Sequence, residues 1–359
     1  MLEPIHSPPF RKHPLRWLQI NLFSNWFNSL LTIAVGYALI TLIPGLIDWV
    51  FLSADWSGTT SADCSREGAC WVFIDARMNQ FMYGFYPSEE QWRVDLAFAF
   101  LVSLVIPLFI ERVPRKGWLI GFILIGYPII ANWLFFGNIF GLKQVDTEQW
   151  GGLMLTLIIA TVGIIASLPI GVLLALGRRS EMPIIRWICI SFIEVMRGVP
   201  LITILFMASV MLPLFMPEGV SFDKLVRAMI GITLFQSAYM AEVIRGGLQA
   251  IPKGQYEAAD ALGLNYFQKM ALVILPQALK LVIPGIVNTF IALFKDTSLI
   301  LIIGLFELSG IMKAALNDPE WLGFATEGYL FAALIYWMFC FSMSRYSMHL
   351  ENKLHTGHK

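Results

Sequence analysis

Long hydrophobic runs separated by short polar segments dominate the chain. Crossing the hydrocarbon core of a bilayer takes about 20 apolar residues in a helix. Eight runs approach or reach that length, so the pattern predicts an all-α integral membrane protein with about eight transmembrane helices. The expected spans are residues 29–50, 95–110, 117–136, 151–176, 188–216, 228–243, 281–305 and 328–343. The sequence lacks the two-residue alternation of a membrane β-barrel.

Composition excludes several other classes of protein. Of the 359 residues, 57% are hydrophobic and only 14% are charged, and the mean hydropathy is +0.68. These values do not describe soluble domains or intrinsically disordered chains. The formal net charge of +0 provides no basic field for nucleic acid. We therefore expect membrane lipid around the chain and no nucleic-acid partner.

The distribution of Lys and Arg indicates the orientation, because these residues concentrate in cytoplasmic loops. With both termini in the cytoplasm, sixteen of the 25 Lys and Arg residues fall in cytoplasmic segments and seven in outer loops. The remaining two, Arg197 and Lys295, fall inside spans. A multi-pass protein with cytoplasmic N- and C-termini is therefore expected.

The spans divide the chain into four parts. These are a cytoplasmic tail with an interfacial helix (1–28), three leading helices with a periplasmic loop at 51–94 (29–136), a five-helix core with a cytoplasmic segment at 246–276 (148–350), and a second tail (351–359). The mixed apolar and polar residues before the first span suit an interfacial helix, although an aromatic belt would have the same composition. No cleavable signal is recognisable, so we expect the first span to be retained.

Two of the four cysteines lie in the expected periplasmic loop. Cys64 and Cys70 have five residues between them, and in an oxidising compartment they can close a small loop, so we predict a disulfide. Cys189 and Cys340 lie within apolar spans and are expected to be small packing residues.

A polar, helix-prone segment follows the sixth span. It contains Glu257-Ala258-Ala259, then three residues, Gly263, nine residues, and Val273-Ile274-Leu275-Pro276. Pro252 at the start of its first helix and Gly263 just past the end are typical start and stop signals. Gly263 can take the left-handed conformation, and Asn265 can cap the next helix. The pattern predicts two short helices joined at a tight corner outside the membrane.

This segment resembles the EAA signature of permease subunits in ATP-binding-cassette (ABC) importers. The matching residues are Glu257, Ala258, Ala259, Gly263, Leu275 and Pro276, together with Val273 where Ile is more usual. In that family the segment is a coupling helix that docks into a groove of the ATPase subunit, so the resemblance implies ATPase coupling for these residues. An ordinary interfacial helical hairpin is the alternative.

Three more segments resemble signatures of polar amino acid permeases. They are residues 194–200 (EVMRGVP), 241–247 (AEVIRGG) and 294–299 (FKDTSL). The five-helix core of such type I importer permeases corresponds to about residues 148–350. The three leading spans resemble those of the larger permease subunits of general L-amino acid systems, which implies a bacterial inner membrane.

The resemblance also implies partners and a cofactor. The expected partners are ABC ATPase subunits, a periplasmic amino acid binding protein, and a second permease subunit, which we expect to be a different chain rather than a second copy. ATP with Mg²⁺ is expected on the ATPase, because this chain has no Gly-x-x-x-x-Gly-Lys-Ser/Thr loop. All five His lie in the tails and no catalytic signature occurs, so neither a metal site nor an enzymatic activity is expected.

Charged residues inside spans are costly and point to a function. Glu194 and Arg197 lie three residues apart on one helical face, where they can pair. Lys295 and Asp296 lie in the seventh span. Alternatively, these charges only neutralise one another so that the helices can pack. Pro200 removes a backbone donor and predicts a break in the fifth span, and broken helices within a membrane line cavities.

A free amino acid is a zwitterion, so its site needs both a cation and an anion. The planar guanidinium of Arg197 matches a carboxylate, and Asp296 or Glu194 would take the ammonium group. The predicted substrate-binding residues are Glu194, Arg197, Gln236, Asp296, Thr297 and Ser298. The neighbouring permease subunit is the alternative location of the ligand.

The predicted function is therefore that of a permease subunit of an ATP-driven amino acid importer, which forms the path and couples to the ATPase through the EAA segment. One alternative is a proton-coupled secondary transporter with Glu194 and Asp296 as proton relays. Another is an intramembrane enzyme. Neither alternative needs a docking segment outside the membrane.

Overall fold

The computed structural model describes residues 14–110, 113–114, 116–138, 141–217 and 222–354. Over these residues the regular elements are helices, with only isolated β-bridges, which confirms the predicted all-α class. The chain divides into two units, Met1–Asp75 and Ala76–Lys359. Four of the five histidines, His6, His13, His355 and His358, fall outside the described residues.

The first unit contains one long apolar helix. α1 (Pro14–Asn21) precedes α2 (Trp26–Ile47), which continues as the π-helical turn η1 (Asp48–Leu52). The side chain of Asn25 caps α2 by accepting a 2.8 Å hydrogen bond from the amide of Asn28. Trp26–Leu52 is long and apolar enough to span a membrane, and α2 has no buried residue. A helix that is apolar on all sides suits a lipid environment, as predicted for the first span.

The loop that follows η1 is held by local hydrogen bonds. The Asp63 carboxylate, in η2 (Ser61–Asp63), accepts hydrogen bonds from the amides of Thr59 and Thr60 at 2.8 and 2.9 Å, which lower the pKa of that carboxyl group. The Cα atoms of Cys64 and Cys70 are 5.7 Å apart and their sulfur atoms are joined. This geometry is compatible with the disulfide, whose presence in the protein stays a prediction.

The second unit begins within α3 (Val72–Tyr83) and continues with two apolar helical segments. The first is η3 (Ser88–Glu90) with α4 (Gln91–Phe109). The second consists of α5 (Lys116–Gly121), η4 (Phe122–Gly126) and α6 (Tyr127–Phe136). α4 packs on α6. Both segments are long and apolar enough to cross a membrane, as predicted.

Arg93 links the start of α4 to the segment that follows α6 through its side-chain contacts. Its side chain is fully buried, pairs with Glu90 at 3.1 Å, and donates a 3.0 Å hydrogen bond to the carbonyl of Lys143. A Cβ atom at Gly137 would come within 2.8 Å of Arg93 Nη1, so glycine is needed at this crossing.

The core begins with η5 (Thr147–Gln149) and α7 (Gly152–Arg178), which packs along α11 (Lys224–Ala250) more extensively than any other pair of described helices. Gly171 permits this close approach, because a Cβ atom there would lie 2.6 Å from Met240 Cγ.

Between α7 and α11 along the chain come α8 (Pro183–Gly198), α9 (Leu201–Phe206), η6 (Met207–Met211) and α10 (Leu212–Leu214). The α8 axis meets that of the α9–α10 segment at 104°, with the break at Val199 and Pro200, as the sequence predicted.

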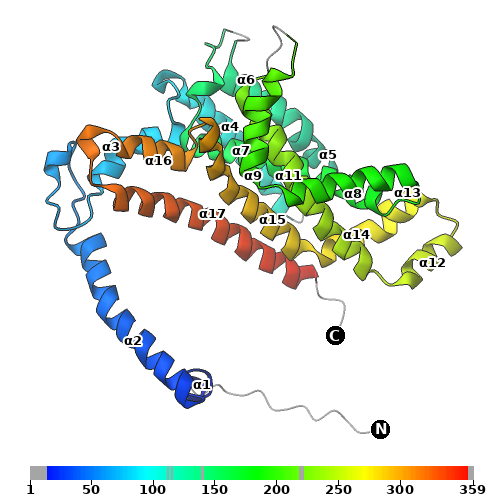
Figure 1. Cartoon of the computed structure of the whole chain (residues 1–359), viewed down its shortest axis with the longest axis horizontal. Coiled ribbons are helices and arrows are strands. Elements are labelled where there is room, and N and C mark those ends of the chain that lie inside the picture. Colours follow the sequence, from blue (N-terminus) through cyan, green and yellow to red (C-terminus); the bar gives the residue numbers. More distant parts are fainter. Residues whose placement is uncertain (1–13, 111–112, 115, 139–140, 218–221, 355–359) are drawn as a thin grey trace. The chain divides into compact units, whose positions relative to one another are not determined.

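The rest of the core runs from one end of the unit to the other. α12 (Lys253–Ala261), α13 (Tyr266–Gln268), η7 (Lys269–Ile274) and α14 (Leu275–Leu281) lie at one end (Figure 1). α15 (Ile283–Asp296) continues as the 3₁₀-helix η8 (Thr297–Ile303). α16 (Leu308–Leu316) and η9 (Pro319–Trp321) lie at the opposite end, and α17 (Ala325–Leu354) returns along α15 (Figure 1).

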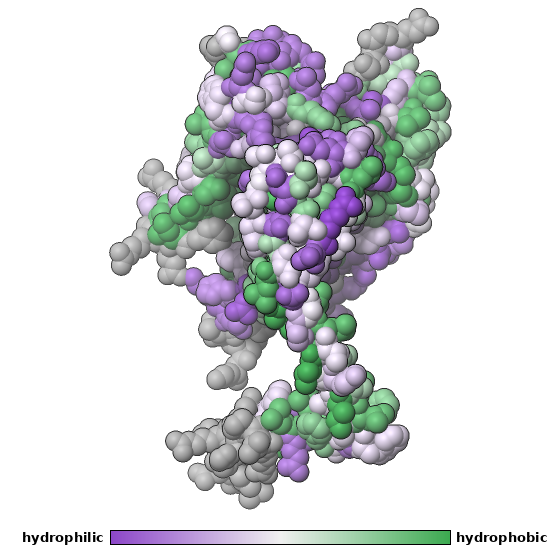
Figure 2. All heavy atoms as spheres, turned by 90° about the vertical axis from the view of Figure 1, so that its left-hand side faces the viewer, coloured by the Kyte–Doolittle hydropathy of each residue, from purple (hydrophilic) through white to green (hydrophobic). Residues whose placement is uncertain are grey.

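Five helices of the described chain are long and apolar enough to cross a membrane, and a sixth span results if the bent α8–α10 pair is counted as one. The remaining two of the eight predicted spans correspond to α11 and α17, which contain 27 and 30 residues. These two helices are long enough but less apolar than the others, because they carry charged side chains such as Glu242 and Glu327. On the face drawn in Figure 2, patches of hydrophobic side chains alternate with hydrophilic ones.

Candidate functional site

A polar pocket lies between α11 and α15. Its volume is about 280 Å³, and its lining residues are Phe235, Gln236, Tyr239, Asn288, Thr289, Ala292 and Asp296. The buried Gln236 side chain donates a hydrogen bond to the carbonyl of Thr289, which ties the two helices together. The Asp296 carboxylate is the only charged group in this lining and gives the pocket a negative end.

A cluster of charged side chains joins α7, α8 and α11. Glu242 of α11 is shared by three arginines: Arg178 at 2.9 Å, Arg245 at 2.8 Å and Arg197 at 3.6 Å. Arg178 also pairs with Glu194 at 2.9 Å. Interlocked pairs of this kind compensate the cost of placing charge among apolar helices.

Arg197 connects this cluster to the polar pocket. Its guanidinium lies 5.6 Å from the centre of the Tyr239 ring, and Tyr239 lines the pocket. Arg197 is also the weakest-held member of the cluster, because its 3.6 Å distance to Glu242 exceeds that of an ordinary hydrogen bond. A carboxylate ligand near Tyr239 can therefore compete for Arg197.

The predicted substrate residues do not all meet at one point. Gln236 and Asp296 share the pocket, whereas Thr297 is buried beside it and donates a 2.7 Å hydrogen bond to the carbonyl of Phe294. The Ser298 hydroxyl bonds to its own helix, at the carbonyl of Lys295. Glu194 pairs with Arg178 instead of Arg197, and its side chain is 55% exposed. The expected pairing across one turn of α8 was therefore wrong.

Sequence reasoning missed several residues of the site. Asn288, Ala292 and Asp296 recur every four residues and so share one face of α15. Gln236 and Tyr239 lie three residues apart and share one face of α11. That periodicity was available in the sequence. Arg178 and Arg197 as partners of Glu242 were not, because they depend on how α7 and α8 pack against α11, whereas Arg245 lies three residues from Glu242 on the same helix.

The local structure of the EAA segment agrees with its sequence pattern. Pro252 lies at the start of α12, and Gly263 takes the left-handed conformation with φ of +72°. Asn265 and Gln268 exchange hydrogen bonds of 2.9 and 3.1 Å between side chain and backbone, which caps α13. The predicted tight corner between two short helices is confirmed.

The EAA segment is exposed on one side and anchored on the other. Glu257 and Ala258 face outward, whereas Ala259 is buried against its own chain. Beside the exposed pair, large apolar side chains protrude from the corner, with Leu262 78% and Phe267 80% exposed. Apolar groups exposed together mark a surface that contacts another protein or the membrane.

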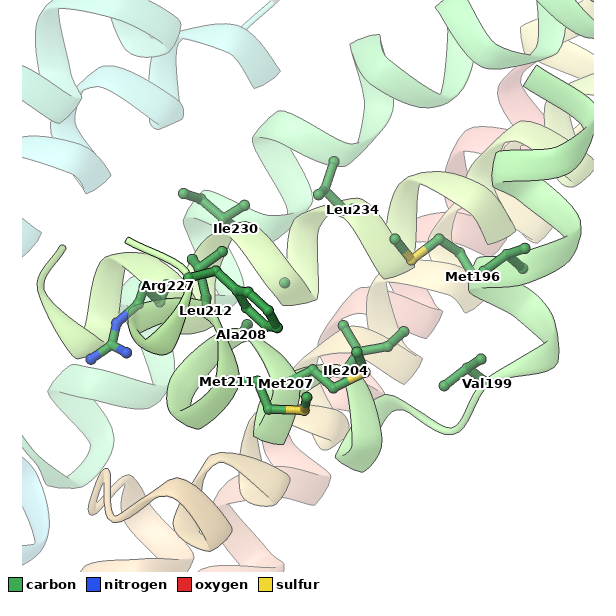
Figure 3. Close-up of a pocket in the computed structure, with 13 residues that line it drawn as sticks. Met196, Val199, Ile204, Met207, Ala208, Met211, Leu212, Arg227, Ile230 and Leu234 are labelled. Atoms are coloured by element: carbon green, nitrogen blue, oxygen red, sulfur yellow. The ribbon is translucent and has the colours of Figure 1, made fainter. Parts of the chain in front are cut away.

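An apolar pocket of about 430 Å³ lies where α8, α9 and η6 face α11 (Figure 3). Its walls include Met196, Ile204, Met207, Leu212 and Leu234, and Arg227 lies at its edge. Arg227 donates a hydrogen bond to the carbonyl of Ser209. These walls offer no pair of opposite charges for a zwitterion. Within the described residues no group of three or more His, Cys, Asp or Glu suits a metal ion.

Comparisons with known proteins agree with this architecture. The family described as "Binding-protein-dependent transport system inner membrane component" matches residues 167–356. The chain is 61% identical to the inner membrane amino-acid ABC transporter permease protein YhdY of Escherichia coli K12, over 95% of this chain and 93% of that protein. It is 40% identical to the glutamate/glutamine/aspartate/asparagine transport system permease protein BztC of Rhodobacter capsulatus, over 100% and 98% of the two chains. A solved structure, "Crystal structure of an amino acid ABC transporter with histidines", has a TM-score of 0.50 and 30% identity, covering 56% of this chain and 92% of that one.

The helical core with its apolar, span-length helices and the match to known permeases define a transport permease. The match covers more than half of the chain, and the chain belongs to the family of inner membrane components of binding-protein-dependent transport systems.

Proposed function

We propose that this chain is the permease subunit of an ATP-driven importer of amino acids. The α12–α14 segment carries the proposal, because it matches the EAA signature and exposes Glu257, Ala258 and an apolar corner outside the spans. Gly263, Leu275 and Pro276 shape that segment, and its docking partner is an ABC ATPase subunit. Two relatives whose names refer to amino-acid transport support the substrate class.

The amino acid binds at the polar pocket, and Arg197 lies over the ring of Tyr239, one of the lining residues. The Asp296 carboxylate meets the ammonium group, and Arg197 meets the carboxylate after it leaves Glu242. Gln236 supplies a polar contact between them, and Thr297 and Ser298 shape the backbone beside Asp296. While the pocket is empty, ion pairs with Glu194 and Glu242 hold the arginine side chains in position.

The docking segment belongs on the cytoplasmic side, which gives cytoplasmic termini and a periplasmic loop at residues 51–94. The Lys and Arg distribution supports this orientation. The proposed core is residues 148–350, with the three leading helices at 29–136. The family match at 167–356 overlaps this core.

The other components follow from the same proposal. A periplasmic binding protein delivers the substrate, ATPase subunits bind ATP with Mg²⁺, and a second permease chain completes the path. The subunit itself catalyses no reaction and carries no cofactor. The proton-coupled alternative is not favoured, because the family depends on a binding protein.

Purification of the tagged chain from its native inner membrane tests this proposal. Mild detergent extraction should recover an ABC ATPase in stoichiometric amount, with a second permease chain. A Leu262→Glu, Phe267→Glu variant should be inserted normally but recover little ATPase, whereas Trp56→Glu, Phe85→Glu, in the proposed periplasmic loop, should retain it. An active wild-type chain that recovers no ATPase would contradict the proposal.

A further inference from the structure

The start of α16 is fixed by one buried carboxylate. Glu307 is fully buried and caps the helix, accepting hydrogen bonds from the amides of Gly310 and Ser309 at 2.9 and 3.0 Å. Burial raises the pKa of its carboxyl group, and the hydrogen bonds partly offset that effect. Burial of a carboxylate costs free energy unless hydrogen-bond donors surround it, so Glu307 depends on its partners.

Glu307 also reaches two long helices of the core. The Tyr336 hydroxyl of α17 donates to it at 2.7 Å, and the Thr156 hydroxyl of α7 lies 3.5 Å away. Thr156 in turn accepts a 3.1 Å hydrogen bond from the amide of Leu308. The carboxylate therefore joins α16, α7 and α17 at one buried point.

Tyr336 extends this network to the polar pocket. Its ring packs on Phe294 with centroids 5.5 Å apart, and the carbonyl of Phe294 accepts a 2.7 Å hydrogen bond from the Thr297 hydroxyl. Thr297 is fully buried and directly follows Asp296, the charged residue of the pocket. The buried network thus reaches the residue next to Asp296, the proposed partner of the ammonium group.

We propose that Glu307 and Tyr336 are positioning residues for the amino acid site: they hold the Phe294–Thr297 turn so that Asp296 faces Gln236. This inference rests on the proposed role of the polar pocket in binding the amino acid. Neither residue lines the pocket, so their effect passes through Thr297 and Phe294. The same network ties the position of α16 to occupation of the pocket.

Equilibrium binding to the purified permease–ATPase complex, without binding protein, tests the inference. The probes are radiolabelled L-glutamate and L-glutamine. Tyr336→Phe removes one oxygen atom and should raise Kd roughly tenfold, as expected for a lost hydrogen bond to a buried charged group, while the number of sites per complex stays unchanged. Glu307→Gln should weaken binding in the same direction, because the donors reach both carboxylate oxygens and an amide replaces one of them with an NH2 group that cannot accept. Tyr329→Phe, on the same helix but 51% exposed, is the matched control and should bind like wild type.

The outcomes separate the inference from the proposed function. An unchanged Kd in Tyr336→Phe, with wild-type binding intact, overturns the positioning role alone. A lower number of sites with an unchanged Kd also overturns it, because that result describes loss of folded complex. A wild-type complex that binds neither amino acid overturns the proposed substrate site, and the positioning role with it.

Discussion

The guanidinium of Arg179, at the C-terminal end of α7, donates a 3.1 Å hydrogen bond to the hydroxyl of Tyr256 in α12. Both groups also bond to the carbonyl of Leu248, at 3.0 and 3.1 Å. The preceding residue, Arg178, pairs with Glu242 of the charged cluster. Two consecutive arginines therefore link the proposed coupling helix to the residues that hold Arg197.

This linkage predicts a coupling defect in Tyr256→Phe. The variant loses the hydrogen bonds to Arg179 and Leu248 but keeps the aromatic ring, so α12 should dock normally and transmit less of its motion. We expect ATP hydrolysis to continue while the amount of amino acid taken up per ATP falls roughly fivefold, as for a loss of about 1 kcal/mol. Reconstituted complexes allow both rates to be measured. Tyr266→Phe, a half-exposed neighbour in α13, serves as the control. An unchanged ratio in Tyr256→Phe would show that the link is only structural.

Two exposed glycines provide a matched test of the coupling corner. Neither Gly254 nor Gly263 has an atom within 4 Å of an added Cβ, but only Gly263 has a positive φ, of +72°. Gly263→Ala should cost about 1–2 kcal/mol of local strain and reduce uptake, and Gly263→Val should abolish it with normal membrane insertion. Gly254→Ala lies within α12 and should be neutral or slightly stabilising. Normal uptake by Gly263→Val with the ATPase attached would rule out the docking role.

The substrate site predicts different effects for two arginines of α8. Arg197→Lys keeps the charge but loses the planar fork, so amino acid uptake should fall at least about tenfold while ATPase assembly is retained. Arg186→Lys is the same chemical change on an exposed side chain of α8 and should transport normally. Asp296→Asn should be as damaging as Arg197→Lys, because it removes the only charge in the pocket lining. If both Arg197→Lys and Asp296→Asn leave uptake unchanged, the ligand lies in the neighbouring permease chain.

The loop of the first unit carries a prediction about oxidation and topology. Cys64 and Cys70 should resist a membrane-impermeant maleimide until a reductant is added, and both should then react from the periplasmic side. Cys189 and Cys340 lie in helices of the core and serve as internal references. Two thiols that react without reductant would exclude the bridge.

Local rules predicted some features of the site correctly, and packing decided the rest. The break at Pro200 and the left-handed Gly263 follow from the stereochemistry of single residues, so the sequence was enough for both. The partner of Glu194 depends on the end of α7 reaching α8, which no spacing within α8 reveals. The role of Glu307 was likewise not predictable from local spacing, because its partners Thr156 and Tyr336 lie 151 and 29 residues away along the chain.

The energy source of uptake tests the central claim most directly. The purified complex, reconstituted with its binding protein in proteoliposomes, should accumulate radiolabelled L-glutamate or L-glutamine when ATP and Mg²⁺ are supplied to the ATPase side, with a protonophore present. Omission of ATP, with an imposed proton gradient in its place, should stop accumulation. Accumulation driven by the proton gradient without ATP, and abolished by the protonophore, would contradict the assignment of this chain as an ABC importer permease.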